Sequence, residues 1–101
     1  MSDDDKHRAR IFFHRGQLAQ AKDAYEQAVT DDRLGDNPRE LSASLGNLGN
    51  VCALSGDFEM AETCYREVLT IQRLLAALYV REQNSLSAIR CLERVVSLDQ
   101  H

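Results

Sequence analysis

Several residue types that shape strands, disulfide-rich domains or membrane spans are scarce in this chain. It has no tryptophan, one proline, five glycines, three cysteines, and three each of tyrosine and phenylalanine. Few runs of β-branched residues occur, whereas leucine and alanine are abundant, and this composition favours helix over strand. With 101 residues the chain forms one domain with a modest core. The sequence therefore predicts an all-α fold.

Basic blocks are also absent, since the chain carries a formal charge of -4 and never more than two consecutive lysines or arginines. This pattern argues against binding to nucleic acid or to an anionic membrane surface through a basic patch. The longest strongly apolar tract, residues 71–80, is too short to span a bilayer and contains Arg73. The first ten residues lack the apolar centre of a signal peptide. We expect a cytoplasmic protein.

The three cysteines are odd in number and form no C-x-x-C pair, so neither a disulfide framework nor a zinc site is indicated. Cys52, Cys64 and Cys91 all lie in apolar helical stretches, where a packing role is expected. His7 and His14 lie two turns apart, with only Asp3 or Asp4 as further candidate ligands. We expect no bound metal.

Catalytic signatures are missing as well. No serine is flanked by glycines in a nucleophile elbow, and "GNLGN" lies inside a helical pattern, not after a strand, which argues against a nucleotide site. We expect no enzyme activity and no cofactor.

An internal repeat organises the first two thirds of the chain. Residues 14–29 superimpose on residues 54–69 with a constant shift of 40. The paired positions are Gly16 with Gly56, Leu18 with Phe58, Ala21 with Ala61, Tyr25 with Tyr65, and Ala28 with Val68. From the small residue onward this spacing marks one face of a helix. Each glycine lies where the preceding helix must stop, a position that suits its left-handed conformation.

Upstream of Gly56 a second amphipathic pattern runs through Leu45, Leu48, Gly49 and Cys52 at intervals of three and four residues. Two helices joined by a turn as short as "SGD" must pack as an antiparallel hairpin. Glycine inside a helix costs roughly 1 kcal/mol relative to alanine. We interpret both glycines of "GNLGN" as packing residues, with Gly49 and Ala61 allowing the two helices to approach closely.

The stretch "NLGNVCALSGDFEMAETCYREVL" resembles a tetratricopeptide repeat. The matching positions are Leu48, Gly49, Gly56, Ala61 and Tyr65, with departures at Cys52 and Val68. The first unit matches less completely, because Arg8 and Ala9 replace the expected Leu-Gly pair. The resemblance implies an α-solenoid of antiparallel helical hairpins, with unit one at 5–34, unit two at 38–70 and a degenerate unit three at 71–98.

The shift of 40 exceeds the usual repeat length of 34, and we assign the excess to a loop in "TDDRLGDNPRE". Asn37 is the expected N-cap of the next helix, with Pro38 at its first position and Glu40 as capping-box partner. At the other end of unit one, residues 1–4 are expected to be disordered.

The third unit lies at a shift of 27, which leaves no room for a loop after unit two. Its matching positions are Leu75, Ala76, Tyr79, Ala88, Leu92 and Val95. No helix-breaking residue occurs between Phe58 and Arg81, which predicts one continuous helix over 58–82; a kink at 70–72 is the alternative. Asn84 and Ser85 would then separate it from a last helix at 85–98. The other helices are predicted at 5–15, 17–31 and 38–54.

A fused helix would leave an apolar surface near the C-terminus that is too large for a monomer. We expect a homodimer, formed by exchange of the C-terminal hairpin between two copies. The residues predicted to self-associate are Ile71, Leu74, Leu75, Leu78, Tyr79, Leu92 and Val96.

The resemblance also implies a concave groove, lined by the first helix of each unit, that binds a partner peptide or helix. The residues it places there are Lys6, Arg10, Phe13, His14, Asn47, Asn50, Leu54 and Arg73. A full clamp for a peptide carboxylate is not expected, because Thr70 and Leu74 replace its lysine and arginine. Asn50 is the best candidate for contacting a ligand backbone. The implied function is a non-catalytic adaptor or scaffold; the alternatives are a chaperone for a secreted or assembling subunit and a self-assembling structural protein.

Overall fold

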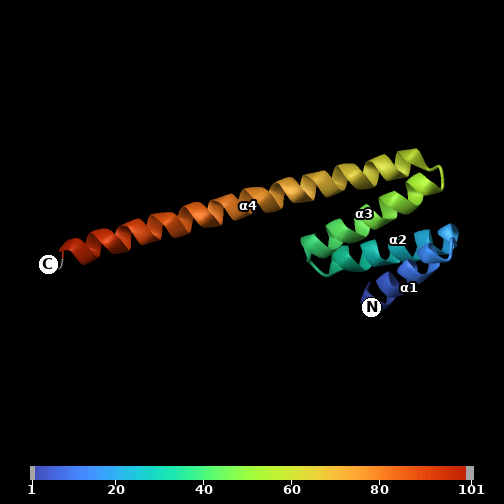
Figure 1. The fold of residues 1–101 in the computed structure, drawn as a ribbon, viewed down its shortest axis with the longest axis horizontal. Coiled ribbons are helices and arrows are strands. Elements are labelled where there is room, and N and C mark those ends of the chain that lie inside the picture. Colours follow the sequence, from blue (N-terminus) through green and yellow to red (C-terminus); the bar gives the residue numbers. More distant parts are fainter. Residues whose placement is uncertain (1, 100–101) are drawn as a thin grey trace.

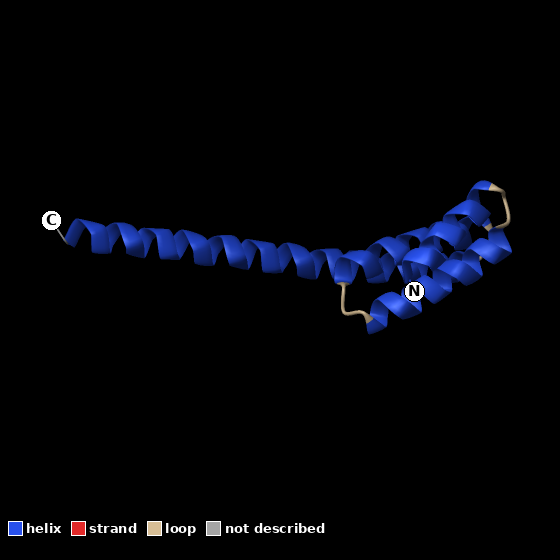
Figure 2. Ribbon diagram, turned by 90° about the horizontal axis from the view of Figure 1, so that it is seen from below, coloured by secondary structure: helices blue, strands red, loops and turns tan. Residues whose placement is uncertain are grey.

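A computed structural model describes the backbone of residues 2–99 and the side chains of residues 4–94. Within that range the chain forms four helices and no strand (Figures 1 and 2). The helices are α1 (Ser2–His14), α2 (Leu18–Leu34), α3 (Pro38–Leu54) and α4 (Phe58–Asp99). The predicted all-α fold is confirmed.

The helices form a layered bundle in which each packs on the next along the chain. α1 and α2 form one antiparallel hairpin, α3 and the first part of α4 form a second, and α2 packs against α3 (Figure 1). The core is rich in small side chains, which lets the helices approach closely. Its buried members are Ala9, Ala21, Ala24, Tyr25, Val29, Leu45, Leu48, Val51, Cys52, Ala61 and Cys64. Burial of Cys52 and Cys64 confirms their predicted packing role, whereas Cys91 is exposed.

The two hairpin turns are built identically, as the repeat predicts. Gly16 and Gly56 adopt left-handed φ values of 74° and 86°. In the first turn the amide of Gly16 donates to the Phe13 carbonyl at 3.0 Å. The amide of Gln17 donates to the Phe12 carbonyl at 2.9 Å. Corresponding bonds occur at Gly56, and both sets have the Schellman pattern that ends a helix.

The connection between α2 and α3 is shorter than predicted. α2 continues to Leu34, so its predicted end at residue 31 was wrong, and the loop predicted within residues 30–40 is confined to residues 35–37. Asn37 is the N-cap, since its Oδ1 accepts from the Glu40 amide at 3.2 Å, and Pro38 is the first helical residue. Those two predictions are confirmed. The Glu40 carboxylate instead lies 3.5 Å from Lys6 Nζ.

The start of the chain also differs from expectation. α1 begins at Ser2, so disorder over residues 2–4 was wrong, and Met1 lies outside the described residues. Acidic residues at 3–5 favour this helix end through the helix dipole. Asp5 is buried and pairs with Arg8 Nη2 at 3.3 Å.

The two glycines inside α3 have different surroundings. A Cβ atom on Gly49 would lie 2.8 Å from Cε1 of Tyr65 on α4, so the absence of a side chain is required for that contact. A Cβ on Gly46 would meet nothing within 4 Å. The packing role is confirmed for Gly49 and was wrong for Gly46.

α4 is a single helix of 42 residues that leaves the bundle and continues alone (Figure 1). The fused helix is confirmed through residues 70–72, whereas the break predicted at Asn84 and Ser85 was wrong. These two residues weaken a helix by less than about 1 kcal/mol each, and neither glycine nor proline is present to stop it. The described residues therefore contain no separate helix at 85–98 and no third hairpin.

The extended helix makes the molecule long. Its extents are 70 × 26 × 22 Å and its radius of gyration is 20.2 Å, whereas a compact chain of this length has about 13 Å. Apolar residues remain exposed along the free part of α4. They include Leu74, Leu78, Tyr79, Leu86, Ile89 and Leu92.

Candidate functional site

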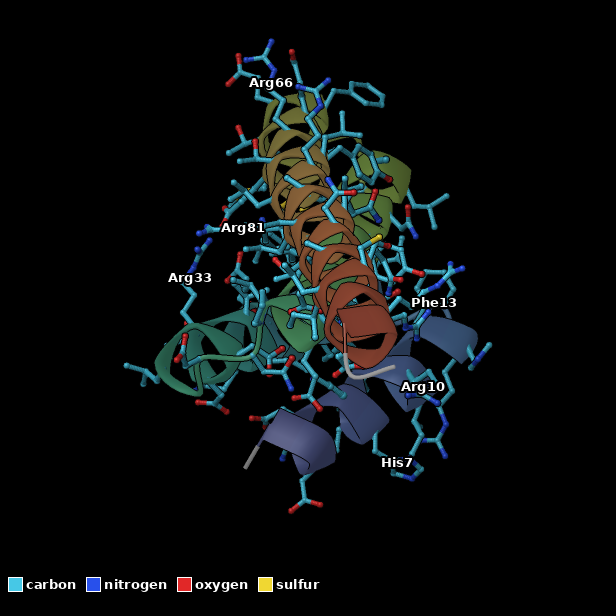
Figure 3. All side chains as sticks on the ribbon, turned by 90° about the vertical axis from the view of Figure 1, so that its left-hand side faces the viewer. His7, Arg10, Phe13, Arg33, Arg66 and Arg81 are labelled. Carbon is cyan, nitrogen blue, oxygen red and sulfur yellow. The ribbon has the colours of Figure 1, made fainter. Side chains whose placement is uncertain are left out.

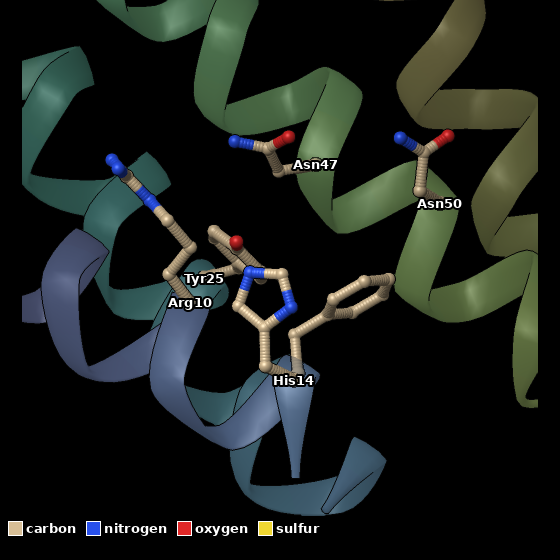
Figure 4. A pocket seen from close by; sticks show the side chains of 6 residues that line it. Arg10, His14, Tyr25, Asn47 and Asn50 are labelled. Atoms are coloured by element: carbon tan, nitrogen blue, oxygen red, sulfur yellow. The ribbon is translucent and has the colours of Figure 1, made fainter. Parts of the chain in front are cut away.

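One pocket lies between α1 and α3, with a residue of α2 in its lining. Its volume is about 270 Å³. Figure 4 shows the side chains that line it. Its lining comprises Arg10, Phe13 and His14 from α1, Tyr25 from α2, and Asn47 and Asn50 from α3. Viewed along α4, Arg10 and Phe13 lie on one side of the molecule and Arg33 on the other (Figure 3). The pocket thus gathers residues from two repeat units on one face.

Helical spacing explains how α1 presents its three residues together. One turn of α1 separates Arg10 from His14, and Phe13 directly precedes His14, so the three side chains lie on neighbouring parts of one face. The Phe13 and His14 rings contact edge to face, with centroids 5.9 Å apart and an interplanar angle of 79°. α1 therefore supplies a cation next to an aromatic wall.

Tyr25 forms the buried part of the lining. Burial raises the pKa of its phenol, and the nearby Arg10 charge lowers that pKa to a smaller extent. A phenol with its ordinary pKa of 10.0 is already neutral at physiological pH, and the rise in pKa leaves that state unchanged. Tyr25 thus presents an aromatic surface and an O–H group, and Arg10 is close enough for its charge to be felt there.

Asn50 is held by a neighbour outside the pocket. The Tyr65 hydroxyl on α4 donates to Asn50 Oδ1, and the same tyrosine ring packs against Gly49. This bond uses one of the two lone pairs of Oδ1, so the second lone pair and the Nδ2 donors remain for a ligand. Asn47 lies one turn earlier on α3, so two amides line the same wall of the pocket (Figure 4).

Five of the eight predicted groove residues line this pocket: Arg10, Phe13, His14, Asn47 and Asn50. Lys6, Leu54 and Arg73 are not part of its lining. Lys6 Nζ lies 3.2 Å from Asp32 Oδ2 and 3.5 Å from Glu40 Oε2, so two carboxylates of its own chain already pair with it. Occupation of Lys6 by these carboxylates is a further reason against a carboxylate clamp.

The network around Lys6 was not predicted. Asp32 is buried, and its Oδ2 also accepts from the Ser44 hydroxyl at 2.6 Å, which links α1, α2 and α3. The helix was predicted to end at residue 31, so Asp32 was not recognised as a buried helical residue. Tyr25 was recognised as a repeat position but not as a pocket residue. The available sequence signal was its equivalence to Tyr65 in the next unit.

The described part of the chain also bears on metal binding and membrane insertion. No group of three or more histidine, cysteine, aspartate or glutamate side chains is arranged to hold a metal ion there. None of the described helices combines the length and apolar character of a membrane span.

A family model for the tetratricopeptide repeat matches residues 5–73. The chain belongs to the tetratricopeptide repeat family. Domains of this family are generally non-catalytic modules for protein interaction. The matched region of this tetratricopeptide repeat chain covers most of α1, all of α2 and α3, and the part of α4 that packs on them. Comparisons with curated proteins and with solved structures give no match.

Proposed function

We propose that the pocket between α1 and α3 binds a segment of a partner polypeptide, and that the protein is an adaptor or scaffold. The observation that carries this proposal is the convergence of five predicted groove residues, from two repeat units, on one pocket with Tyr25. Recognition depends on shape, apolar contact and a few hydrogen bonds to the partner backbone.

The lining suggests which features of a peptide are bound. Asn47 and Asn50 offer amide donors and acceptors, which suit the N–H and C=O groups of an extended backbone. Phe13 and Tyr25 offer aromatic surface to an apolar side chain. Arg10, which is exposed and has no ion pair within the described side chains, favours an acidic side chain nearby.

Selection and titration together test the groove. A displayed library of random 12-residue peptides is selected on the protein, and the affinity of an enriched peptide is measured by calorimetry. Asn47→Ala and Arg10→Ala should each weaken binding about 3- to 10-fold, as expected for one lost hydrogen bond or charge contact. Arg39→Ala is the matched control, because Arg39 is an exposed arginine outside the pocket. Equal affinities in all variants would contradict the proposed site.

Self-association through α4 is the second candidate function. Exposed apolar residues along the free part of α4 favour a homodimer. Exchange of a C-terminal hairpin has no structural basis while α4 is unbroken, so helix pairing replaces it in this proposal. Val96 was predicted to take part, and its side chain lies outside those described. Absolute mass by light scattering across a range of concentrations tests the dimer.

Two remaining predictions accompany these proposals. We propose two repeat units: unit one at 5–34, with most of α1 and all of α2, and unit two at 38–70, with α3 and the start of α4. We propose that residues 71–98 are a segment derived from a third repeat. We also propose a cytoplasmic location, which the free thiols of Cys52, Cys64 and Cys91 support.

A further inference from the structure

The free part of α4 carries an apolar stripe with a regular spacing. Intervals of four and three residues alternate along it, which is the heptad spacing of a coiled coil. Its members are Leu75, Leu78, Glu82, Ser85, Ile89 and Leu92. In the sequence the spacing extends back to Ile71, which packs against the bundle core, and on to Val96. Leu78 and Ile89 are 52% and 50% exposed, so this stripe is largely unoccupied in the single chain.

The stripe is symmetric about its centre, which lies between Gln83 and Asn84. Leu78 and Ile89 are equally distant from this point, as are Leu75 and Leu92. Glu82 and Ser85, the two polar members, flank the centre. If a two-fold axis through this point related two copies of the helix, apolar residues of one copy would face apolar residues of the other. Glu82 of each copy would face Ser85 of the other.

We propose that two copies of this chain pair their α4 helices antiparallel around a two-fold axis between Gln83 and Asn84. This inference rests on the self-association proposed above and specifies its geometry. Leu78 packs against Ile89 of the second copy, and Leu75 packs against Leu92 of the second copy. Each pair occurs twice, as an isologous dimer requires.

The two polar members distinguish this arrangement from a parallel one. In a parallel pair in register, Glu82 would face Glu82 of the second copy at a core position, where like charges repel. In the antiparallel pair Glu82 faces Ser85, whose hydroxyl donates to the carboxylate. Glu82 and Ser85, with Leu78, Arg81 and Leu86, line a shallow groove on α4 at this centre.

Residues beside the stripe are compatible with the same register. Arg81 would lie next to Ala88 of the second copy, and Tyr79 next to Leu86 of the second copy, so no like charges are brought together. Arg73 and Arg94 project from the opposite side of the helix, as the helical period of 3.6 residues requires. The second copy is therefore the occupant whose charges and apolar spacing match this surface.

Antiparallel pairing places the two bundles at opposite ends of a rod. Each bundle keeps its own pocket between α1 and α3, because α4 contributes no residue to the lining of that pocket. The dimer thus presents two peptide sites at a fixed separation, which favours partners that carry two copies of the recognised segment.

Disulfide trapping tests the direction of pairing. Leu78→Cys and Ile89→Cys are made separately in a Cys91→Ser background, which removes the exposed thiol. A disulfide requires Cα atoms within about 7 Å. In the antiparallel pair the two copies of position 78 would lie about 16 Å apart along the helix, at roughly 1.5 Å per residue, whereas position 78 would face position 89 of the second copy. Oxidation should therefore cross-link a mixture of the two variants and neither variant alone.

Each other result would overturn the inference. Cross-linking of Leu78→Cys alone indicates a parallel pair, and a dimer without any cross-link indicates another surface. A monomer at every concentration overturns both this geometry and the self-association it rests on. The Cys91→Ser parent gives the background from Cys52 and Cys64, and helix content by circular dichroism verifies that each variant is folded. Peptide binding at the pocket is measured separately, so its failure is distinguishable from failure of the pairing.

Discussion

Gly49 and Tyr65 are in such close contact that a Cβ on the glycine would lie 2.8 Å from Cε1 of the tyrosine. The hydroxyl of the same tyrosine donates to Oδ1 of Asn50, a residue of the pocket. The contact that joins α3 to α4 therefore also orients a side chain of the candidate binding site. We therefore expect stability and peptide binding to be coupled at this point.

Substitution of Gly49 is expected to destabilise the protein even though alanine is the better helix former. The added methyl group would force the Tyr65 ring to move, and overpacking of this kind costs about 1–3 kcal/mol. Gly46→Ala is the matched control, because its methyl group meets nothing within 4 Å and should stabilise by roughly 0.5–1 kcal/mol. Urea unfolding of both variants measures the difference, and equal effects would contradict the packing role.

Tyr65→Phe isolates the hydrogen bond from the ring contact. The ring against Gly49 is retained and the bond to Asn50 is lost, so the free energy of unfolding should fall by about 0.5–1.5 kcal/mol. Affinity for a selected peptide should fall as well, because the Asn50 amide is no longer oriented. Tyr79→Phe, at an exposed tyrosine on the free part of α4, should change neither quantity.

The buried Asp32 is expected to be a major determinant of stability. Its side chain is 1% exposed and contacts both Lys6 and Ser44. Asp32→Asn removes the nearer and more buried of the two charges that compensate Lys6, and breaking a buried pair costs about 3 kcal/mol. Asp31→Asn, at the neighbouring less buried position, should change stability by less than about 0.5 kcal/mol. Thermal unfolding of the two variants provides the comparison; a small effect at Asp32 would show that the network is dispensable.

The pair between Arg33 and Glu67 predicts a pH dependence of stability. Arg33 Nη1 lies 2.5 Å from Glu67 Oε2, and hydrogen bonding by Arg33 lowers the pKa of Glu67 from 4.5. Because the folded-state pKa is depressed, the contribution is complete above the ordinary value of 4.5 and is lost as the pH falls through the lowered one. The stability difference between the parent and Glu67→Gln should be constant near neutral pH and shrink below about pH 4.5. A difference that does not change with pH would contradict this assignment.

Much of the architecture was predictable because it depends on local patterns. The hairpin turns followed from Gly16 and Gly56, the start of α3 from Asn37 and Pro38, and the continuity of α4 through residues 70–72 from the lack of any breaking residue. Five of the six pocket residues followed from the resemblance and the helical register.

The sequence by itself thus determined the helical class, the repeat and two complete hairpin turns, since these depend on backbone preferences and on the helical period, whereas the face of the pocket followed from the family resemblance. Only the tertiary structure decided that Asp32 is buried with Lys6, that Gly49 is required where Gly46 is not, and that α4 continues through Asn84 and Ser85. Those outcomes depend on contacts between residues distant in sequence, or on small differences in helix propensity that no local signal resolves.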